Sequence, residues 1–362
     1  MTPDDPLDEI ERLIRRDPAR RGLIATESAR GPLCPRHFQP AARHLAKNGQ
    51  HIAIVTGFFI PSATPAAAET DGPPGAAMLA AALIGCGMSA QIVTDERCLN
   101  AVRIAAREMS LTNSAVTVAG NTAEEIEHWF HATMACDKHP PWTHLIAIER
   151  VGPSHTRDSI IRQMKPTDAR RPALLPSESS ETELSASDQA ELQEFEQRVP
   201  ANSWNHCHNM RGLPLDEYTA PLHRLFELAE TTQKLTTIGI GDGGNEIGMG
   251  AIRWNELRHR LSDPTTAHIP CRISTDWTIV TGVSNWGGMA LAAAILLLRH
   301  QQQLMAPWTS RQQLHLLERL VKDGPAVDGI TRLPQPTVDG LPFLTYIQPW
   351  EGIRRSLERT DA

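Results

Sequence analysis

Aromatic residues, long apolar runs and paired cysteines are all scarce in this 362-residue chain. Aromatics make up 5% of the residues and apolar residues 41%, which suits a helix-and-sheet protein better than a β-sandwich. The longest apolar stretch, residues 289–298, is too short to cross a bilayer. The first residues are acidic and proline-rich and do not form a leader, so we expect a soluble, cytoplasmic protein with no membrane partner.

Basic patches and metal-ligand spacings are missing as well. The net charge is −7 and the arginines are scattered, which argues against a nucleic-acid partner. The six cysteines form no CxxC pair, so we expect reduced thiols. His206, Cys207 and His208 look like zinc ligands, but no second cluster has zinc spacing, and a packing or surface role is favoured.

Short apolar segments and amphipathic segments alternate along most of the chain. This alternation predicts an α/β fold: a mostly parallel sheet with helices on both faces and Rossmann-like layering. The expected strands are 51–57, 90–94, 115–118, 144–148, 236–240 and 278–282. The expected helices are 7–14, 40–47, 73–86, 96–109, 122–134, 187–197, 217–233, 251–261, 285–299, 311–321 and 349–357.

The domain organisation follows from the same pattern. Residues 1–50 are expected to form a helical segment that packs on a single catalytic domain of residues 51–362. A surface insertion at about 164–200, rich in Pro, Ser and Glu, breaks the alternation, and we expect it to be mobile or to act as a lid. The sequence is also compatible with a homo-oligomer.

Residues 239–250 contain six glycines, and Asp242, Asn245 and Glu246 stand among them. A strand is expected before this loop and a helix after it, which is where open α/β sheets place ligands. The loop contains GxGxxG, so a nucleotide- or phosphate-binding enzyme is one alternative. Against it, Asp242 would repel a pyrophosphate, and neither a Walker lysine nor the acidic residue expected about 20 positions on is present.

Acidic residues also follow other predicted strands or precede helices. Glu69 and Asp71 stand in a turn rich in Gly and Pro, and Asp95 and Glu149 follow two further strands. Oxygen ligands of this kind suit Mg²⁺ or Mn²⁺, and they also suit a substrate ammonium group. The alternative is that each acid caps its own helix.

Polar groups at other strand ends are candidates for substrate binding. Thr56 ends the first predicted strand, and Ser284 and Asn285 open a helix whose free N–H groups suit a carboxylate, although both could simply cap that helix. Arg211 could bind a substrate carboxylate through two of its guanidinium nitrogens. Asp328 and Asp339 stand in two Val-Asp-Gly motifs that are typical of ordinary turns.

Together these motifs resemble the D-glutamate cyclase family, in its catalytic domain. The matching segments are residues 17–22, 55–61, 69–76, 148–150, 209–212, 239–250, 282–288 and the two Val-Asp-Gly turns. The resemblance does not extend to residues 151–205, where Trp204, His206 and His208 precede Asn-Met-Arg-Gly.

The resemblance implies a lyase that closes D-glutamate to 5-oxo-D-proline with loss of water, a small-molecule amino-acid substrate, and a Mn²⁺ or Mg²⁺ ion without a nucleotide or organic cofactor. Such a reaction needs a base for the amine and an acid for the carboxylate. We therefore expect Asp242 or Glu246 to act as base. Glu69, Asp71 and Asp242 are expected to hold the metal, and Thr56, Arg211, Asn245, Ser284 and Asn285 to bind substrate. A non-catalytic small-molecule or metal-binding relative is the other alternative.

Overall fold

Six parallel strands form the middle layer of the protein in the computed structural model, which describes residues 5–24, 31–137, 140–165, 184–232, 235–261 and 266–358. The strands lie in the order β5, β4, β1, β6, β7, β8. Their bounds are β1 (His51–Thr56), β4 (Ser89–Thr94), β5 (Val116–Val118), β6 (His144–Ile148), β7 (Thr236–Gly241) and β8 (Trp277–Val280). The predicted α/β class with a mostly parallel sheet is therefore confirmed.

The strand order also indicates where a ligand would bind. Numbered within this sheet by chain position, the order is 3-2-1-4-5-6, that of a doubly wound Rossmann sheet. Successive strands are added on one side of β1 up to β5 and on its other side from β6 onward. Ligands of such sheets bind beyond the carboxyl ends of the strands at this switch between β1 and β6.

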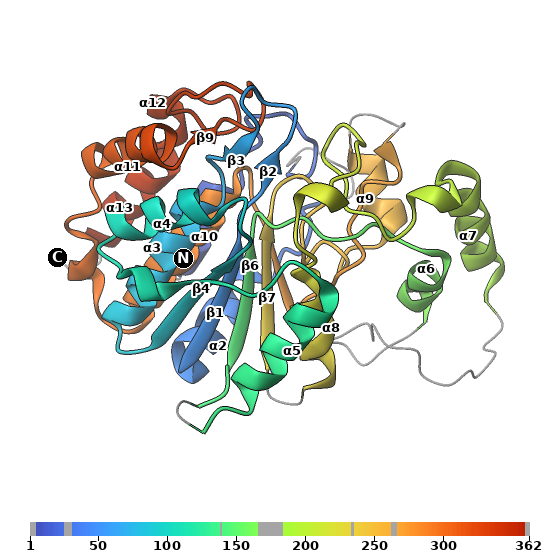
Figure 1. The fold of residues 1–362 in the computed structure, drawn as a ribbon, viewed down its shortest axis with the longest axis horizontal. Helices are drawn as coiled ribbons and strands as arrows, with labels where there is room; N and C mark the ends of the chain where they lie inside the picture. The colour runs from blue at the N-terminus through green and yellow to red at the C-terminus, as the bar shows by residue number, and fades with distance from the viewer. Residues whose placement is uncertain are drawn as a thin grey trace.

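The alternation of side chains along each strand builds a separate core on each face of the sheet. In β1, Ile52 and Ile54 enter one core, whereas Ala53 and Val55 enter the other. Figure 1 shows α5 and α8 in front of the sheet and α2, α3 and α10 behind it. Helices on both faces were expected from the sequence, and their burial explains the nearly continuous apolar strands.

The helix bounds locate most of the predicted elements to within a few residues. The first core includes α1 (Pro6–Ile14), α2 (Phe38–Asn48), α3 (Pro73–Gly85), α4 (Leu99–Glu108), α10 (Ser284–Leu298), α11 (Ser310–Asp323) and α13 (Gln348–Glu358). The second core includes α5 (Ala123–Met134), α8 (His223–Thr231) and α9 (Trp254–Arg260). Short elements are α12 (Phe343–Tyr346) and the 3-10 turns η1 (Asn113–Ala115), η2 (Ala201–Ser203), η3 (Asp216–Tyr218) and η5 (Gln302–Met305). No helix in the described ranges combines the length and the apolar character that a membrane span requires.

Three predicted helices begin at least three residues later than expected, and one of them, predicted over 96–109, begins at Leu99 as α4. The helix predicted over 217–233 begins at His223 as α8, because Pro221 disfavours helical backbone in the residue before it. The helix predicted over 251–261 begins at Trp254 as α9. Residues 248–250 are instead held in a loop, because the amides of Gly248 and Gly250 both donate to the Ile273 carbonyl.

The predicted insertion is described only in part. The expected polar helix over 187–197 is present as α7 (Ala186–Arg198), and it packs against α6 (Arg157–Met164), which the sequence did not predict. Residues 166–183 lie outside the described residues, so the lid expectation stays a prediction. The predicted division of the chain at residue 50 also stays a prediction. Helix α1 packs directly on α10 and α13.

A second, three-stranded sheet was not predicted. It consists of β2 (Phe59–Ile60), β3 (Ala67–Glu69) and β9 (Ala326–Val327), in that order. Strands of two or three residues are too short to show a period of two in the sequence. This small sheet fixes Glu69 opposite Val327, above the carboxyl end of the main sheet.

Helices α3 and α10 cross in close contact, and two glycines make the contact possible. A Cβ atom on Gly288 would lie 2.8–2.9 Å from backbone atoms of Gly75, and one on Gly75 would lie 2.9 Å from the Cα of Asn285. Both helices are buried almost all round. The starts of the two helices are therefore locked together beneath the carboxyl edge of the sheet.

Gly288→Ala is expected to destabilise the fold by roughly 1–3 kcal/mol, because backbone atoms must move to admit the methyl group. The matched control is Gly85→Ala near the end of α3, where the new methyl group meets only the flexible end of Leu304. Urea unfolding of both variants measures the difference. Equal midpoints for Gly288→Ala and the wild type would contradict the close contact.

Candidate active site

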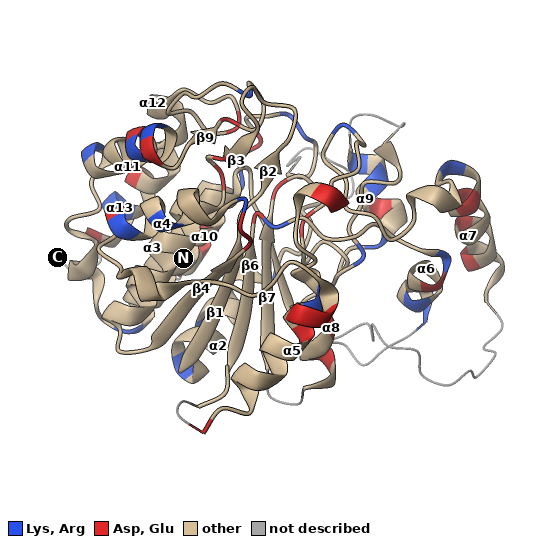
Figure 2. Ribbon diagram, viewed as in Figure 1, with Lys and Arg blue, Asp and Glu red and all other residues tan. Residues whose placement is uncertain are grey.

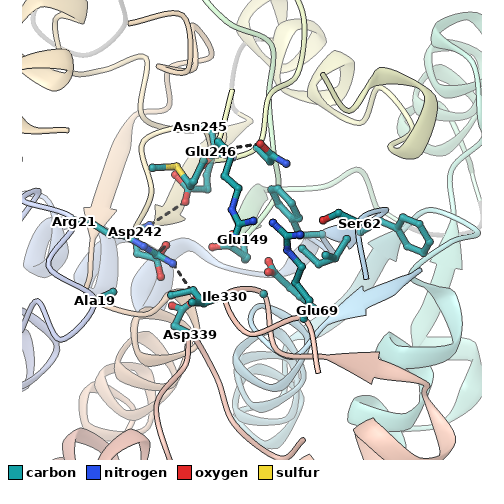
Figure 3. Close-up of a pocket in the computed structure, with 18 of the residues that line it drawn as sticks. Ala19, Arg21, Ser62, Glu69, Glu149, Asp242, Asn245, Glu246, Ile330 and Asp339 are labelled. Carbon is teal, nitrogen blue, oxygen red and sulfur yellow. Dashed lines mark hydrogen bonds and ion pairs between the residues drawn. The ribbon is translucent and has the colours of Figure 1, made fainter. Parts of the chain in front are cut away.

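A cavity of about 320 Å³ opens at the carboxyl ends of β1, β6 and β7, where the strand order predicts a ligand. Figure 3 shows Glu69, Glu149, Asp242 and Asp339 around this one space. The lining residues come from seven segments: Ala19–Arg21; Phe58–Ser62; Glu69; Glu149; Asn209–Arg211; Asp242, Asn245 and Glu246; and Gly329, Ile330, Arg332 and Asp339.

Asp242 follows β7 directly and lies at the floor of the cavity, buried to 3% exposure. Its Oδ2 accepts the amide of Ser284 at 3.0 Å, and its Oδ1 forms an ion pair with Arg21. Burial raises the pKa of this carboxyl well above its usual range, although Arg21 opposes the shift. Asp242 is thus a buried acid with a raised affinity for protons or other cations.

Asp71 caps α10, and it also accepts the amide of the neighbouring Gly72 at 3.0 Å, at the start of its own helix α3. Its two oxygens accept the amides of Ser284 at 2.9 Å and Asn285 at 2.7 Å. In return, the Asn285 side-chain oxygen accepts the amides of Gly72 at 3.0 Å and Gly75 at 2.8 Å, at the start of α3. Each helix is capped by a side chain of the other.

This reciprocal capping corrects one sequence expectation. The N–H groups of Ser284 and Asn285 were expected to hold a substrate carboxylate, but Asp71 and Asp242 occupy them. Ser284 and Asn285 are also fully buried, and neither lines the cavity. They organise the acidic floor and do not face the cavity directly.

Glu149 joins the floor, although the sequence analysis did not assign it a role in the site. It follows β6, and the Ser284 hydroxyl donates to its Oε2 at 2.6 Å. Its backbone has a φ of 47°, a left-handed conformation that is costly for a residue with a side chain and is common at functional sites. Burial and the neighbouring acids raise its pKa well above the usual range.

A different trio of carboxylates gathers than the one predicted to hold a metal. Oxygens of Asp71, Glu149 and Asp242 all lie within 4.8 Å of one another. Glu69, predicted as a ligand, lines the cavity wall beside this trio, and its Oε1 has no hydrogen-bond partner among the described residues. Burial and the nearby Asp71 and Asp339 raise its pKa well above the usual range.

Glu246 serves the loop that carries it. Its Oε1 accepts the amides of Gly243 at 2.6 Å and Asp242 at 3.2 Å, and its Oε2 accepts the amide of Gly244 at 2.7 Å. A carboxylate with three backbone donors is fixed in place. This geometry favours a structural role for Glu246 over the predicted role of base.

The same contacts weaken the nucleotide alternative. The amides of Gly243 and Gly244, which would face a phosphate, donate to Glu246 instead. The GxGxxG also follows β7, the fifth strand of the sheet in chain order, whereas the dinucleotide fingerprint belongs to the first βα turn. After β1 the chain reads Gly57-Phe58-Phe59.

Arg21 and Asp339 are two further site residues that the sequence analysis did not select. The Arg21 guanidinium pairs with Asp242 on one side and with Asp339 at 2.9 Å on the other. Asp339 has a φ of 54°, and its Oδ2 has no partner among the described residues. Asp328, of the first Val-Asp-Gly turn, has the structural role expected of both, because it accepts the amides of Ile330, Thr331 and Gly340.

The remaining predicted residues lie at different distances from the cavity. Arg211 is exposed and lines it. Asn245 lines it too, while its amide donates to the His208 carbonyl at 2.9 Å. Thr56 is fully buried at the end of β1 and is not part of the lining. Asp95 is ion-paired with Arg150 at 2.7 Å and serves the fold.

The floor carries more negative than positive charge. Glu69, Asp71, Glu149, Asp242, Glu246 and Asp339 are all buried, and the ion pairs that they make with described residues all go to Arg21. Figure 2 shows this acidic region near the upper end of β6. Such a floor must hold protons or attract a cation, and oxygen donors of this kind suit a hard divalent ion or an ammonium group.

Comparisons with known proteins agree with the motifs. A family model described as D-glutamate cyclase-like, C-terminal, matches residues 10–171 and 194–349, which include every segment of the cavity. The human protein named mitochondrial D-glutamate cyclase is 27% identical over 361 residues, which cover 92% of this chain. They cover 49% of the human protein, so the chain spans about half the length of this relative. The resemblance seen in the sequence is confirmed.

Glu246→Gln is expected to destabilise the fold by roughly 1–3 kcal/mol. In the wild type both Glu246 oxygens accept backbone N–H groups, whereas in the variant the NH₂ group of the amide would face one of these donors. Glu318→Gln, on α11 outside the cavity, is the control and should unfold like the wild type. Urea unfolding gives the difference. A Glu246→Gln protein with wild-type stability and no turnover would restore the role of base.

The stability of the metal-free protein is expected to fall as pH rises from about 4 to 7. Burial raises the pKa of Asp71 from 3.8 to about 7, so in this window the folded state binds more protons than the unfolded chain. The pKa values of Glu69, Glu149 and Asp242 move in the same direction.

Unfolding free energies measured in urea with a chelator, at several pH values, test this expectation. Asp71→Asn should lose less stability than the wild type between pH 4 and 7, whereas Asp323→Asn on α11 should follow the wild type. If the unfolding free energies of Asp71→Asn and the wild type changed equally with pH, the raised pKa of Asp71 would be contradicted.

Proposed function

Since the chain belongs to the D-glutamate cyclase-like family, we propose that it closes D-glutamate to 5-oxo-D-proline with loss of water. The observation that carries this proposal is the buried acidic floor of the cavity, where Asp71, Glu149 and Asp242 converge. The volume of about 320 Å³ lies at the lower end of small-molecule sites, which suits a substrate the size of an amino acid.

The reaction requires proton movements that carboxyl groups can perform. The substrate ammonium group must lose a proton before its nitrogen can attack the γ-carboxyl carbon. The nitrogen loses a second proton as the new N–C bond replaces a C–O bond, and the departing oxygen takes up two protons and leaves as water. A site with both a proton acceptor and a proton donor fits this sequence of events.

We assign the acceptor role to Asp242. It lines the cavity, and its raised pKa makes it a stronger base than an exposed aspartate. Glu246 is the weaker candidate, because three backbone amides hold its two oxygens, whereas Asp242 accepts one backbone amide.

We assign the donor role to Glu69. Its raised pKa favours the protonated form, and its Oε1 has no partner among the described residues. A protonated carboxyl of this kind can donate to the departing oxygen. This differs from the metal-binding role expected for Glu69 from the sequence.

A divalent ion such as Mn²⁺ or Mg²⁺ fits the donor set of the floor. Asp71, Glu149 and Asp242 would hold it, and it would supply the positive charge that masks the γ-carboxylate. The excess of buried carboxylates over the single Arg21 supports this assignment. Each carboxylate oxygen has two lone pairs, so the hydrogen bonds already present leave room for an ion.

Groups at the cavity wall position the substrate. Arg211 is assigned to the α-carboxylate, and Asn245 lies beside it in the lining. A folded substrate held by these groups brings nitrogen and γ-carbon together, which supplies the proximity contribution to the rate. Ser284 and Asn285 have no direct part, because their amides are already occupied.

Purified protein incubated with D-glutamate is expected to yield 5-oxoproline, whereas L-glutamate is expected to yield none, as measured by chiral chromatography. Asp242→Asn should lower turnover by about 10²–10⁴-fold, the usual contribution of a general base, while the fold is kept. The control is Asp323→Asn on α11, which lies outside the cavity. EDTA should abolish product, and added Mn²⁺ or Mg²⁺ should restore it.

The outcomes separate the alternatives. Near wild-type turnover of Asp242→Asn would overturn its role as base. Tight binding of D-glutamate without product, with every metal tried, would favour a non-catalytic binding protein. Binding of NAD or ATP would revive the nucleotide alternative.

A further inference from the structure

Three arginines line the cavity in addition to Arg21. Arg20, Arg211 and Arg332 come from three separate loops, and we call them the arginine rim. Arg20 and Arg211 are exposed and Arg332 is half-buried, so they lie nearer to solvent than the buried carboxylates of the floor. None of the three guanidinium groups forms an ion pair with a residue in the described ranges.

Each rim arginine is held by a turn that an Asp or Asn side chain closes. For Arg20, the Asp17 carboxylate accepts the amides of Arg21 and Gly22, both at 2.8 Å. For Arg211, the Asn209 side-chain oxygen accepts the amide of Arg211 at 2.9 Å. Turns closed by the Asp17 and Asn209 side chains therefore set the backbone positions of these two arginines.

Arg332 follows the same pattern. Its amide donates to the carbonyl of Asp328 at 2.7 Å, and the Asp328 carboxylate closes the rest of the turn. The backbones of Arg20 and Arg332 have φ values of 55° and 60°, and this left-handed conformation costs free energy in residues with long side chains. Such strain is commonly kept where a side chain must point in a required direction.

The loops of Arg20 and Arg332 are tied to each other. The ion pair between Arg21 and Asp339 joins the 17–22 turn to the 328–340 loop. Arg211 comes from a different loop, which the Asn245 amide ties to the glycine loop through the His208 carbonyl. The rim thus has two parts: Arg20 with Arg332, and Arg211.

We propose that Arg20 and Arg332 form a second carboxylate-binding subsite, which holds one oxygen of the γ-carboxylate while the other oxygen faces the floor, so that with Arg211 the rim selects a substrate with two carboxylates. This inference rests on the proposed function and names two specificity residues for it. A floor rich in carboxylates repels an incoming anion, and these guanidinium groups, which have no ion-pair partner in the part of the chain that the structure describes, offset that repulsion. A ligand with two carboxylates gains from both parts of the rim, whereas its monoamide loses a charge-assisted pair.

Calorimetry with glutarate and with glutaramate tests the subsite without requiring turnover. Glutarate has two carboxylates, and glutaramate replaces one of them with an uncharged amide of the same shape. The wild type should bind glutarate roughly ten- to a hundredfold more tightly. The double variant R20Q/R332Q should lose most of this preference, and R20K/R332K should restore part of it.

The kinetic comparison uses D-glutamate as substrate. R20Q/R332Q should raise KM by roughly tenfold or more and leave kcat nearly unchanged, because the rim selects the substrate and takes no part in the proton transfers. The control is R103Q, an exposed arginine of α4 outside the cavity lining, which should behave like the wild type in both measurements.

The results distinguish this inference from the proposed function. A wild type that binds glutarate selectively but does not convert D-glutamate would overturn the cyclase and keep the subsite. Turnover of D-glutamate with the same KM in R20Q/R332Q would overturn the subsite and keep the cyclase. Equal affinities of the wild type for glutarate and glutaramate would also overturn the subsite.

Discussion

The reciprocal capping of α3 and α10 is the interaction on which the site depends. Asp71 satisfies the first amides of α10, and Asn285 satisfies the first amides of α3. The two helices approach closely through Gly75 and Gly288, so both positive helix ends lie beneath the cavity. These helix ends stabilise buried negative charge, which is why several carboxylates can gather there with Arg21 as their ion-pair partner.

The fold was largely predictable from the sequence, and the exceptions have physical causes. Nearly continuous apolar strands and amphipathic helices have clear periods, and their boundaries were located closely. The sheet of β2, β3 and β9 was missed because its strands are shorter than any readable period. The start of α8 was predicted too early because the effect of Pro221 was not considered. The start of α9 was predicted too early because long-range hydrogen bonds to residue 273 are not visible in local patterns.

The site was predictable only in part. Asp242 and Glu69 could be selected because they stand among glycines or prolines at strand ends, and both line the cavity. The direction in which a carboxylate points was not predictable, so the sequence did not reveal that Asp71 also caps the distant helix α10. Arg21 and Asp339 were missed because they meet only in three dimensions, and neither stands in a motif distinguishable from an ordinary turn.

The pairing of Arg21 with Asp339 also bears on how the protein assembles. The two residues are separated by 318 positions, so the contact forms only when both ends of the chain have come together. A growing chain can fold its first strands and helices long before residue 339 is synthesised. Until then the acidic floor lacks one wall, and its carboxylates remain open to water. During synthesis, therefore, this wall of the cavity cannot close before residue 339 has been made.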